Sequence, residues 1–218
     1  MSFRLVGCLL IKNSVCVQSF SFRGLVPLGM FSLALSFLSK LDPDEICIID
    51  LDGDINNFIK VKGALEGCNL PIVIGGGALK NMPSSEHIFH ERILINSELF
   101  ENDSEILEGI LKHNGRQSII GYLPIKYDAG KFKVYCSTVR GFVSVNDGFW
   151  IKINETCSDI IVLDSEAQGS ESGFNFNLMK KVEFPISRVY ISGGIIHKDI
   201  TKAKDNGYAG VVIDNKSL

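Results

Sequence analysis

The run Leu70-Pro-Ile-Val-Ile-Gly-Gly-Gly77 decides the fold that we predict for this chain. Its residues before the glycines are apolar on both faces, as those of a buried parallel strand are. The glycines that end the run allow a tight turn into a following helix. A similar run, Ile191-Ser192-Gly193-Gly194, lies 117 residues further along when Gly76 is matched with Gly193. Two matched strand–turn–helix units half a chain apart indicate an internal repeat.

The rest of the chain extends this repeat, because short β-branched runs alternate with helix-like segments throughout. The predicted strands are Leu5–Ile11, Glu45–Asp50, Pro71–Ile74, Arg92–Ile95, Ser118–Ile125, Asp159–Leu163, Arg188–Ile191 and Gly210–Ile213. The predicted helices are Leu28–Lys40, Asn56–Glu66, Ser84–His90, Ser104–His113, Asp147–Thr156, Phe176–Val182 and Lys198–Asn206. Ile93-Leu94-Ile95-Asn96 matches Val211-Val212-Ile213-Asp214 at an offset of 118, and Ile49-Asp50 matches Leu163-Asp164 at an offset of 114.

Four strand–helix units, doubled, predict an α/β protein that folds as a (β/α)8 TIM barrel with a half-barrel internal repeat. The barrel is expected to form a single domain over residues 1–218. An open doubly wound sheet is the alternative, but it gives no reason for a twofold repeat. Residues 127–144 break the rhythm, and the alternation of Lys131–Ser137 predicts a hairpin or an extra strand there.

The final helix of the barrel is expected to be missing, because only Lys216-Ser217-Leu218 follow Asn215. Its absence would leave apolar surface open beside Leu5–Ile11. We therefore expect that a partner or a second copy covers this seam, that the outer helices repack, or that the natural chain is truncated.

The composition excludes several classes of protein. With 22 basic and 25 acidic residues the net charge is −3, so no nucleic acid or anionic membrane is expected as a partner. The apolar runs are too short to span a bilayer, and the first is too short for a signal peptide, so we expect a cytoplasmic protein. The six cysteines lack metal-ligand and redox-pair spacing. We expect reduced, buried thiols, with no metal and no cofactor.

Both glycine turns are candidate phosphate sites, because glycine lets the backbone approach an anion and amides at a helix start hold phosphate. Matched strands end in Asn96-Ser97 and Asp214-Asn215, and a weaker third candidate follows the sixth strand. The candidate phosphate-binding residues are Gly76, Gly77, Asn96, Ser97, Gly169, Ser170, Gly193, Gly194, Asp214 and Asn215. They predict a ligand with a phosphate at each end; tight turns that bind no ligand are the alternative.

Four charged residues, Arg4, Glu45, Arg92 and Asp159, stand at the starts of predicted strands. Alternate residues of a strand share a face, and counting from each charge places all four on the inner face of the barrel. They would ring the N-terminal mouth. They are either ordinary ion pairs at a solvated end or a charged gate on a passage through the barrel.

Taken in order, several of these segments resemble one known family. They are Arg4-Leu-Val-Gly-Cys-Leu-Leu-Ile-Lys12, Asp44-Glu45-Ile-Cys-Ile-Ile-Asp50, Leu70-Pro-Ile-Val-Ile-Gly-Gly-Gly77, Ile95-Asn96-Ser97, Gly169-Ser-Glu-Ser-Gly173 and Ser192-Gly-Gly194. From Arg4 to about Asn215 the chain resembles HisF, the cyclase (synthase) subunit of imidazole glycerol phosphate synthase. The resemblance implies a barrel with two phosphate sites and a HisH-like glutaminase subunit docked on its N-terminal face. It also implies that ammonia crosses the barrel through a gate at Arg4, Glu45, Arg92 and Asp159.

The chain departs from HisF at the residues that carry the chemistry. The two aspartates that serve the family as general acid and base correspond to Leu10 and Pro124, which cannot transfer a proton. The lysine of the loop after the first strand corresponds to Gln18, and Leu94 is bulky beside the expected ammonia path. Cys8–Asn13 is more similar to the AglZ, or second-copy HisF, branch. That resemblance implies conversion of an acetamido group to an acetamidino group in surface-polysaccharide synthesis.

We therefore expect the synthase subunit of a glutamine amidotransferase pair, which adds ammonia to a phosphate-bearing or nucleotide-bearing substrate. Asp50, Asp164 and Lys12 are the remaining candidate catalytic residues. The two aspartates end matched strands and either steer an amine or cap loops; the lysine either contacts an anionic group or is a solvated loop residue. A catalytically degenerate, phosphate-binding scaffold is the alternative function.

Overall fold

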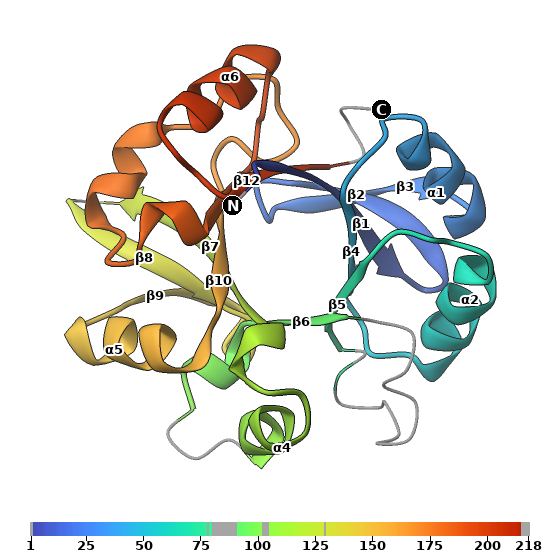
Figure 1. Cartoon of the computed structure of the whole chain (residues 1–218), viewed down its shortest axis with the longest axis horizontal. Helices are drawn as coiled ribbons and strands as arrows, with labels where there is room; N and C mark the ends of the chain where they lie inside the picture. Colours follow the sequence, from blue (N-terminus) through green and yellow to red (C-terminus); the bar gives the residue numbers. More distant parts are fainter. Residues whose placement is uncertain (1, 78, 80–90, 102–104, 129, 215–218) are drawn as a thin grey trace.

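The computed structural model describes residues 2–77, 79, 91–101, 105–128 and 130–214. Within them, eight parallel strands close a barrel (Figure 1). They are β1 (Arg4–Lys12), β4 (Glu45–Asp50), β5 (Ile72–Gly76), β6 (Arg92–Ile95), β7 (Ile119–Asp128), β10 (Asp159–Asp164), β11 (Val189–Ser192) and β12 (Gly210–Ile213). Each strand pairs with the next, and β12 pairs with β1 to complete the circle. The predicted TIM barrel and all eight predicted strands are confirmed.

Helices surround the barrel and cover the outer faces of its strands (Figure 1). The α-helices are α1 (Phe31–Ser39), α2 (Ile55–Leu65), α4 (Glu105–Asn114), α5 (Asp147–Thr156) and α6 (His197–Asp205). The 3₁₀ helices are η2 (Ser97–Leu99), η3 (Arg116–Ser118), η4 (Phe176–Lys181) and η5 (Ile186–Arg188). The helix predicted at Ser84–His90 lies outside the described residues, and no described helix has the length and hydropathy needed to cross a membrane.

Two of the helix predictions need correction. The segment Phe176–Val182 forms a 3₁₀ helix rather than an α-helix. Its hydrogen bonds join residues that are three apart in sequence, such as that from Leu178 N to Asn175 O, at 3.0 Å. The helix predicted at Leu28–Lys40 begins only at Phe31, because the residues before it belong to a strand. Gly29, with φ of 121°, ends that strand in a conformation that a helix does not allow.

Each half of the barrel carries one antiparallel hairpin, after its first strand. In the second half, β7 continues into β8 (Lys131–Cys136) and β9 (Gly141–Ser144), which confirms the predicted extra strand. In the first half, β1 continues into β2 (Val15–Phe20) and β3 (Gly24–Gly29), which the sequence pattern did not predict. The internal repeat therefore extends to the hairpins.

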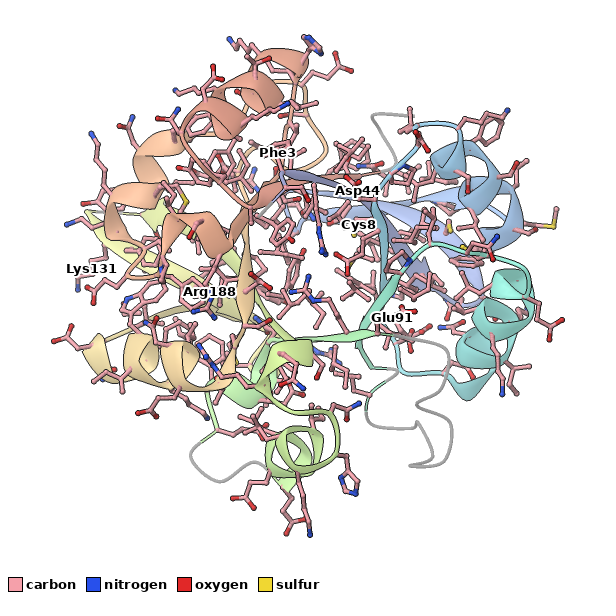
Figure 2. All side chains as sticks on the ribbon, in the orientation of Figure 1. Phe3, Cys8, Asp44, Glu91, Lys131 and Arg188 are labelled. Carbon is pink, nitrogen blue, oxygen red and sulfur yellow. The ribbon has the colours of Figure 1, made fainter. Side chains whose placement is uncertain are left out.

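The side chains of the barrel form separate inner and outer cores. Side chains, among them that of Cys8, fill the barrel (Figure 2). This inner core consists mostly of buried residues from the barrel strands, and it includes Val17 of β2. The outer core lies between strands and helices, where Leu38 of α1 packs so closely on Gly7 that a Cβ atom there would lie 2.5 Å from it. The β1 side of the seam is thus covered by α1. Residues 215–218, on which the prediction of a missing final helix rests, lie outside the described residues.

Candidate functional site

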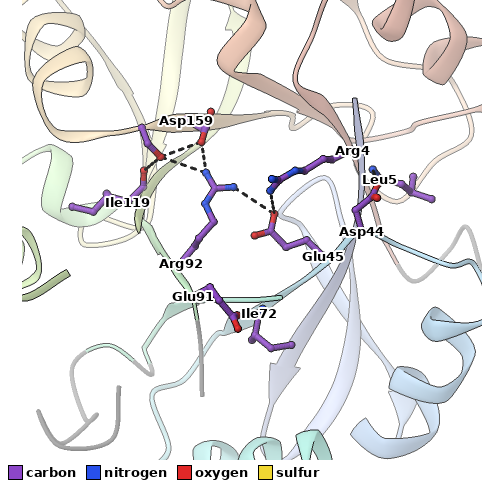
Figure 3. A network of polar contacts seen from close by, with 10 residues as sticks. Arg4, Leu5, Asp44, Glu45, Ile72, Glu91, Arg92, Ile119 and Asp159 are labelled. Atoms are coloured by element: carbon purple, nitrogen blue, oxygen red, sulfur yellow. Dashed lines mark hydrogen bonds and ion pairs between the residues drawn. The ribbon is translucent and has the colours of Figure 1, made fainter. Parts of the chain in front are cut away.

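The four charged residues predicted at the strand starts meet at the N-terminal end of the barrel (Figure 3). Arg92 lies 3.4 Å from Glu45 and is also paired with Asp159. Arg4 approaches the same Glu45 oxygen, at 4.0 Å. We call this set, Arg4, Glu45, Arg92 and Asp159, the charged ring. Because its members come from β1, β4, β6 and β10, the ring joins both halves of the barrel.

Glu45 is the most buried member of the ring, with 1% of its surface exposed. Burial raises the pKa of Glu45, and the positive charges of Arg92 and Arg4 oppose that rise. Its Oε2 atom takes both ion pairs, while Oε1 is buried with no hydrogen-bond partner among the described residues. A buried acceptor without a hydrogen bond lowers the stability of the folded state. A small molecule with an N–H group could donate the missing hydrogen bond.

Side chains fill the barrel between the charged ring and the opposite mouth. Tyr190 interacts with Arg92 immediately inside the ring. Beyond it, Cys8 and Cys47 face each other on paired strands, among the aliphatic residues of the inner core. Leu94, 2% exposed, belongs to the same cluster. A molecule that crosses the barrel therefore needs these side chains to move.

The C-terminal mouth holds a cavity of about 840 Å³, within the usual range for small-molecule sites. Leu10 and Pro124, the residues at the expected aspartate positions, both line it. Gly76 and Gly77 line it as well, with Gly77 N donating to the carbonyl of Asp50 at 2.8 Å. A side chain at Gly76, where φ is 78°, would overlap that carbonyl. The predicted glycine turn thus lies on a cavity wall.

Asp50 reaches the cavity from the end of β4 as part of a polar network. Asn57 Nδ2 donates to Asp50 Oδ1 at 2.9 Å and also to Asp52. Burial raises the pKa of Asp50 to about 6, against the opposing effect of the Asn57 hydrogen bond. Its Oδ2 atom is buried and has no hydrogen-bond partner among the described residues. This oxygen is enclosed, so a ligand donor in the cavity reaches it only when neighbouring side chains move.

The other predicted residues at this mouth divide into two kinds. Lys12 and Ser97 line the cavity. Asn96 also lines it, but its amide is engaged in holding the second hairpin: Nδ2 donates to the carbonyls of Tyr122 and Tyr135, at 2.8 and 2.9 Å. Its Oδ1 accepts from Ser137 N at 3.0 Å. The side chain of Asn96 thus shapes the site, and its neighbour Ser97 is the residue better placed to contact a ligand.

The second glycine turn lines a separate cavity of about 250 Å³. Gly193, Gly194 and Asp214 line it, together with Ser170 of the third candidate turn, whereas Asn215 lies outside the described residues. The β2–β3 hairpin lies between this cavity and the larger one. Gln18 Nε2 donates to Asp214 Oδ2 at 3.2 Å, which ties the hairpin to the end of the barrel.

The matched aspartate of the second half, Asp164, is engaged differently from Asp50. Its carboxylate accepts hydrogen bonds from the backbone of Glu166, Ala167 and Asn175, at 3.1 to 3.2 Å. These bonds fix the loop that carries Gly169, where a side chain would meet the carbonyl of Ser19 at 2.6 Å. Of the two predicted aspartates, Asp50 faces the large cavity and Asp164 holds a loop.

Two charged residues that line the large cavity, Arg23 and Arg140, were not predicted from the sequence, and neither was Asn57, which holds Asp50 from outside the lining. The arginines lie at the tips of the two hairpins, and Asn57 lies on α2. The arginines reach the C-terminal mouth only because the hairpins carry them there, and the β2–β3 hairpin has no recognisable pattern in the sequence. Among the described residues, no group of three or more histidine, cysteine, aspartate or glutamate side chains is arranged to hold a metal ion.

Comparison with known proteins identifies the family. The family described as "Histidine biosynthesis protein" matches residues 4–215. The chain belongs to this family. The histidine biosynthesis protein family therefore accounts for nearly the whole chain, including the charged ring and both glycine turns.

Named relatives within this family are HisF-type subunits. A Vibrio vulnificus (strain YJ016) protein with the provisional name imidazole glycerol phosphate synthase subunit hisF2 is 26% identical, over 89% of this chain and 75% of its own. A Campylobacter jejuni protein with the same provisional name is 24% identical, over 88% and 79%. Imidazole glycerol phosphate synthase subunit HisF of Bacillus cereus (strain G9842) is 25% identical, over 90% and 81%. These names confirm the resemblance to HisF.

A solved structure supports the fold alone. N-acetylmannosamine-6-phosphate 2-epimerase from Clostridium perfringens superposes with a TM-score of 0.54 and 14% identity, covering 98% of this chain and 86% of that chain.

Proposed function

We propose that this chain is the synthase subunit of a glutamine amidotransferase pair. It accepts ammonia from a HisH-like glutaminase subunit on its N-terminal face and adds it to a phosphate-bearing or nucleotide-bearing substrate at its C-terminal mouth. The chain acts as one barrel domain, in the cytoplasm, without metal or cofactor. Membership of the family and the subunit names of its relatives support this proposal.

The charged ring is the observation that carries the proposal. A barrel that only binds a ligand at its C-terminal mouth has no need for four charges at the other end. The buried Oε1 atom of Glu45 supplies an acceptor for ammonia at the centre of the ring. Arg92 covers the way inward from there, because it spans from Glu45 to Asp159. Passage then requires Arg92 and Tyr190 to swing aside when the partner docks.

At the C-terminal mouth we assign the acid–base work to Asp50. A carboxyl with a pKa of about 6 is mostly ionised at neutral pH and can take a proton from attacking ammonia. In that step a C–N bond forms at an activated carbonyl carbon of the substrate, the C=O π electrons move to oxygen, and an ammonia proton moves to Asp50 Oδ2. The oxygen then leaves as water, taking the proton from Asp50 and one from the added nitrogen, while the nitrogen lone pair forms the C=N bond. Lys12 lines the same cavity and offsets negative charge on the substrate.

The glycine turns position the substrate in this proposal. One phosphate lies against Gly76, Gly77 and Ser97, beside the large cavity. A second phosphate site consists of Gly193, Gly194 and Ser170 in the smaller cavity, with Asp214 at its edge. Gly169 and Asp164 hold the adjoining loop. Holding the reacting carbon fixed and dry contributes more here than acid–base groups do.

The finer form of the proposal is formation of an acetamidino sugar for a surface polysaccharide. Leu10 and Pro124 line the cavity where the histidine-pathway cyclase reaction needs two acids, so a different substrate fits this chain better. Relatives named hisF2 and hisF3 in Vibrio vulnificus support a function distinct from that of a single pathway subunit.

A catalytically degenerate, phosphate-binding scaffold is the second candidate function. The tightly packed inner core favours it, because aliphatic side chains and two thiols occupy the line that ammonia would follow. In that case the charged ring serves only to bind a partner.

A coupled assay separates the two functions. The chain is mixed with a HisH-like glutaminase subunit, binding is measured by pull-down, and glutamine turnover is measured with and without the chain. We expect the chain to bind the glutaminase and to raise its glutamine turnover. The variants Arg92→Met and Arg116→Met are then compared in the same assay, because the first removes an arginine of the charged ring and the second removes another arginine of the same face. Binding without any change in turnover would support the scaffold and contradict ammonia transfer.

A further inference from the structure

We propose that Arg23 and Arg140 form a subsite for a second anionic group, of phosphate type, on the ligand that occupies the large cavity. This inference rests on the proposed function in one respect, which is that the large cavity is where the substrate binds. It adds an anion-binding pair that neither glycine turn supplies.

An aromatic contact joins the two hairpins whose tips carry Arg23 and Arg140. Phe22, at the tip of the β2–β3 hairpin, stacks on Tyr135 of β8 with 4.6 Å between ring centroids. It also meets the edge of Phe142 on β9, at 5.9 Å. Arg23 follows Phe22 directly, and Arg140 precedes β9. Both side chains line the cavity beneath this contact.

Neither arginine has an ion pair or a side-chain hydrogen bond in the described part of the chain, which sets the pair apart from the other four arginines. Arg4 and Arg92 are in the charged ring, and Arg116 and Arg188 donate to backbone carbonyls. An arginine normally finds a carboxylate, a carbonyl or a phosphate for its fork of donors. Two without such a partner, on the wall of one cavity, indicate an anionic ligand.

The carboxylates that line the same cavity, those of Asp50, Asp52 and Glu98, form no ion pair with Arg23 or Arg140 in the described part of the chain. Asp52 accepts from Asn13 N at 2.7 Å and from Asn57. Glu98 accepts from Asn96 N at 3.1 Å and from Ser97 Oγ at 3.0 Å. The guanidinium donors of Arg23 and Arg140 therefore remain available to a ligand, and Lys12 lines the same cavity.

The second glycine turn lies outside the large cavity, because Gly193 and Gly194 line the other one. It therefore supplies no donor where Arg23 and Arg140 lie. A molecule in the large cavity meets Gly76 and Gly77 with one anionic group, and Arg23 and Arg140 are the donors within the same cavity for another. A diphosphate, or two separate phosphates on one sugar, has the matching chemistry.

Pyrophosphate binding to the whole chain tests the subsite, with inorganic phosphate and succinate as the other probes. Titration calorimetry compares the unaltered chain with the double variant Arg23→Gln/Arg140→Gln. The control is Lys131→Gln, at the start of β8, which the cavity does not include and which Figure 2 places at the edge of the molecule. We expect the double variant to bind pyrophosphate about tenfold or more weakly, and the control to bind it as the unaltered chain does.

The proposed subsite would be refuted if the double variant and the unaltered chain bound pyrophosphate with equal affinity. It would also be refuted if neither of the two proteins bound pyrophosphate. Tighter binding of succinate than of pyrophosphate would contradict its assignment to phosphate. The thermal midpoint of the double variant should be unchanged, because both arginines are exposed and lack protein partners. The coupled glutaminase assay contains no pyrophosphate. Its result therefore tests the proposed ammonia transfer independently of the calorimetry, which tests the subsite.

Discussion

The side-chain amide of Asn57 lies 2.9 Å from Asp50 Oδ1, and the same nitrogen donates to Asp52. One residue of α2 therefore holds two carboxylates at the cavity. The side-chain oxygen Oδ1 of Asn57 accepts a hydrogen bond, at 2.6 Å, from the backbone N–H of Ser14, which lies in the turn between β1 and β2. Asn57 thus connects the candidate reacting carboxylate to the base of the hairpin that divides the mouth.

Replacing Asn57 with alanine should destabilise the chain by about 1–3 kcal/mol, because the buried backbone and carboxylate groups lose their partners. The pKa of Asp50 should rise further, since the Asn57 hydrogen bond lowers it. Urea unfolding and an NMR titration of Asp50 measure the two effects. Lys60→Ala, on an exposed position of the same helix, is the control and should change neither.

Replacing Asp50 with asparagine should change how stability depends on pH. The pKa of Asp50 is about 6 in the folded chain, against an ordinary aspartate value of 3.8, so the folded state binds the proton more tightly than the unfolded state does. The contribution of Asp50 to the free energy of unfolding is greatest below about pH 4. It falls as the pH rises to about 6, by about 3 kcal/mol at most. Asp50→Asn should remove this loss.

Unfolding by urea at several pH values checks this prediction. The stability of Asp50→Asn relative to the unaltered chain should increase between about pH 4 and pH 6 and then stay constant. Asp128→Asn is the opposite control, because Lys133 lowers the pKa of Asp128 and its contribution is lost as pH falls. A pH-independent difference for Asp50→Asn would contradict the raised pKa.

The charged ring should behave as a coupled unit. Arg92→Met removes the nearest positive charge from Glu45 and should cost about 3 kcal/mol, because it leaves that buried carboxylate with only the 4.0 Å contact of Arg4. Adding Glu45→Met should recover part of that loss, since an apolar side chain replaces the stranded charge. A double-mutant cycle in urea measures the coupling. Additive effects would mean that Arg92 and Glu45 do not support each other.

Two glycines with similar backbone angles should respond very differently to alanine. Gly67, with φ of 88°, has open space where a Cβ atom would lie, so Gly67→Ala should cost only the backbone strain, about 1–2 kcal/mol. Gly76, with φ of 78°, has the Asp50 carbonyl in the way, so Gly76→Ala should cost more than about 3 kcal/mol. Thermal unfolding compares the two, and equal losses would contradict close packing at the turn.

The barrel strands could be predicted because they are buried on both faces and bounded by clear turns. The β8–β9 hairpin was also visible, since polar and apolar residues alternate along Lys131–Cys136. The β2–β3 hairpin was not, because Val17 packs in the inner core while Cys16 packs outside, which removes the alternation. Its turn, Ser21-Phe22, adopts positive φ angles of 48° and 59° without the Asn-Gly signature of such turns.

The site was predictable to the extent that strands alone position it. Strand parity placed the charged ring correctly, because its four members need only the register of the barrel. The partners of Asp50 and the arginine pair depend on α2 and on the hairpin tips. Their positions follow from long-range packing, such as that of Phe22 on Tyr135, which leaves no local pattern in the sequence.

The pairing of β1 with β12 has a consequence for how the chain folds. It joins Arg4 to Gly210, so the barrel closes through contacts between the first and last strands of the described chain. Contacts so distant in sequence form slowly, because a long loop must be ordered first. During synthesis β1 therefore waits with an open edge until β12 has left the ribosome, and this chain depends on its last strand for protection from strand-to-strand aggregation.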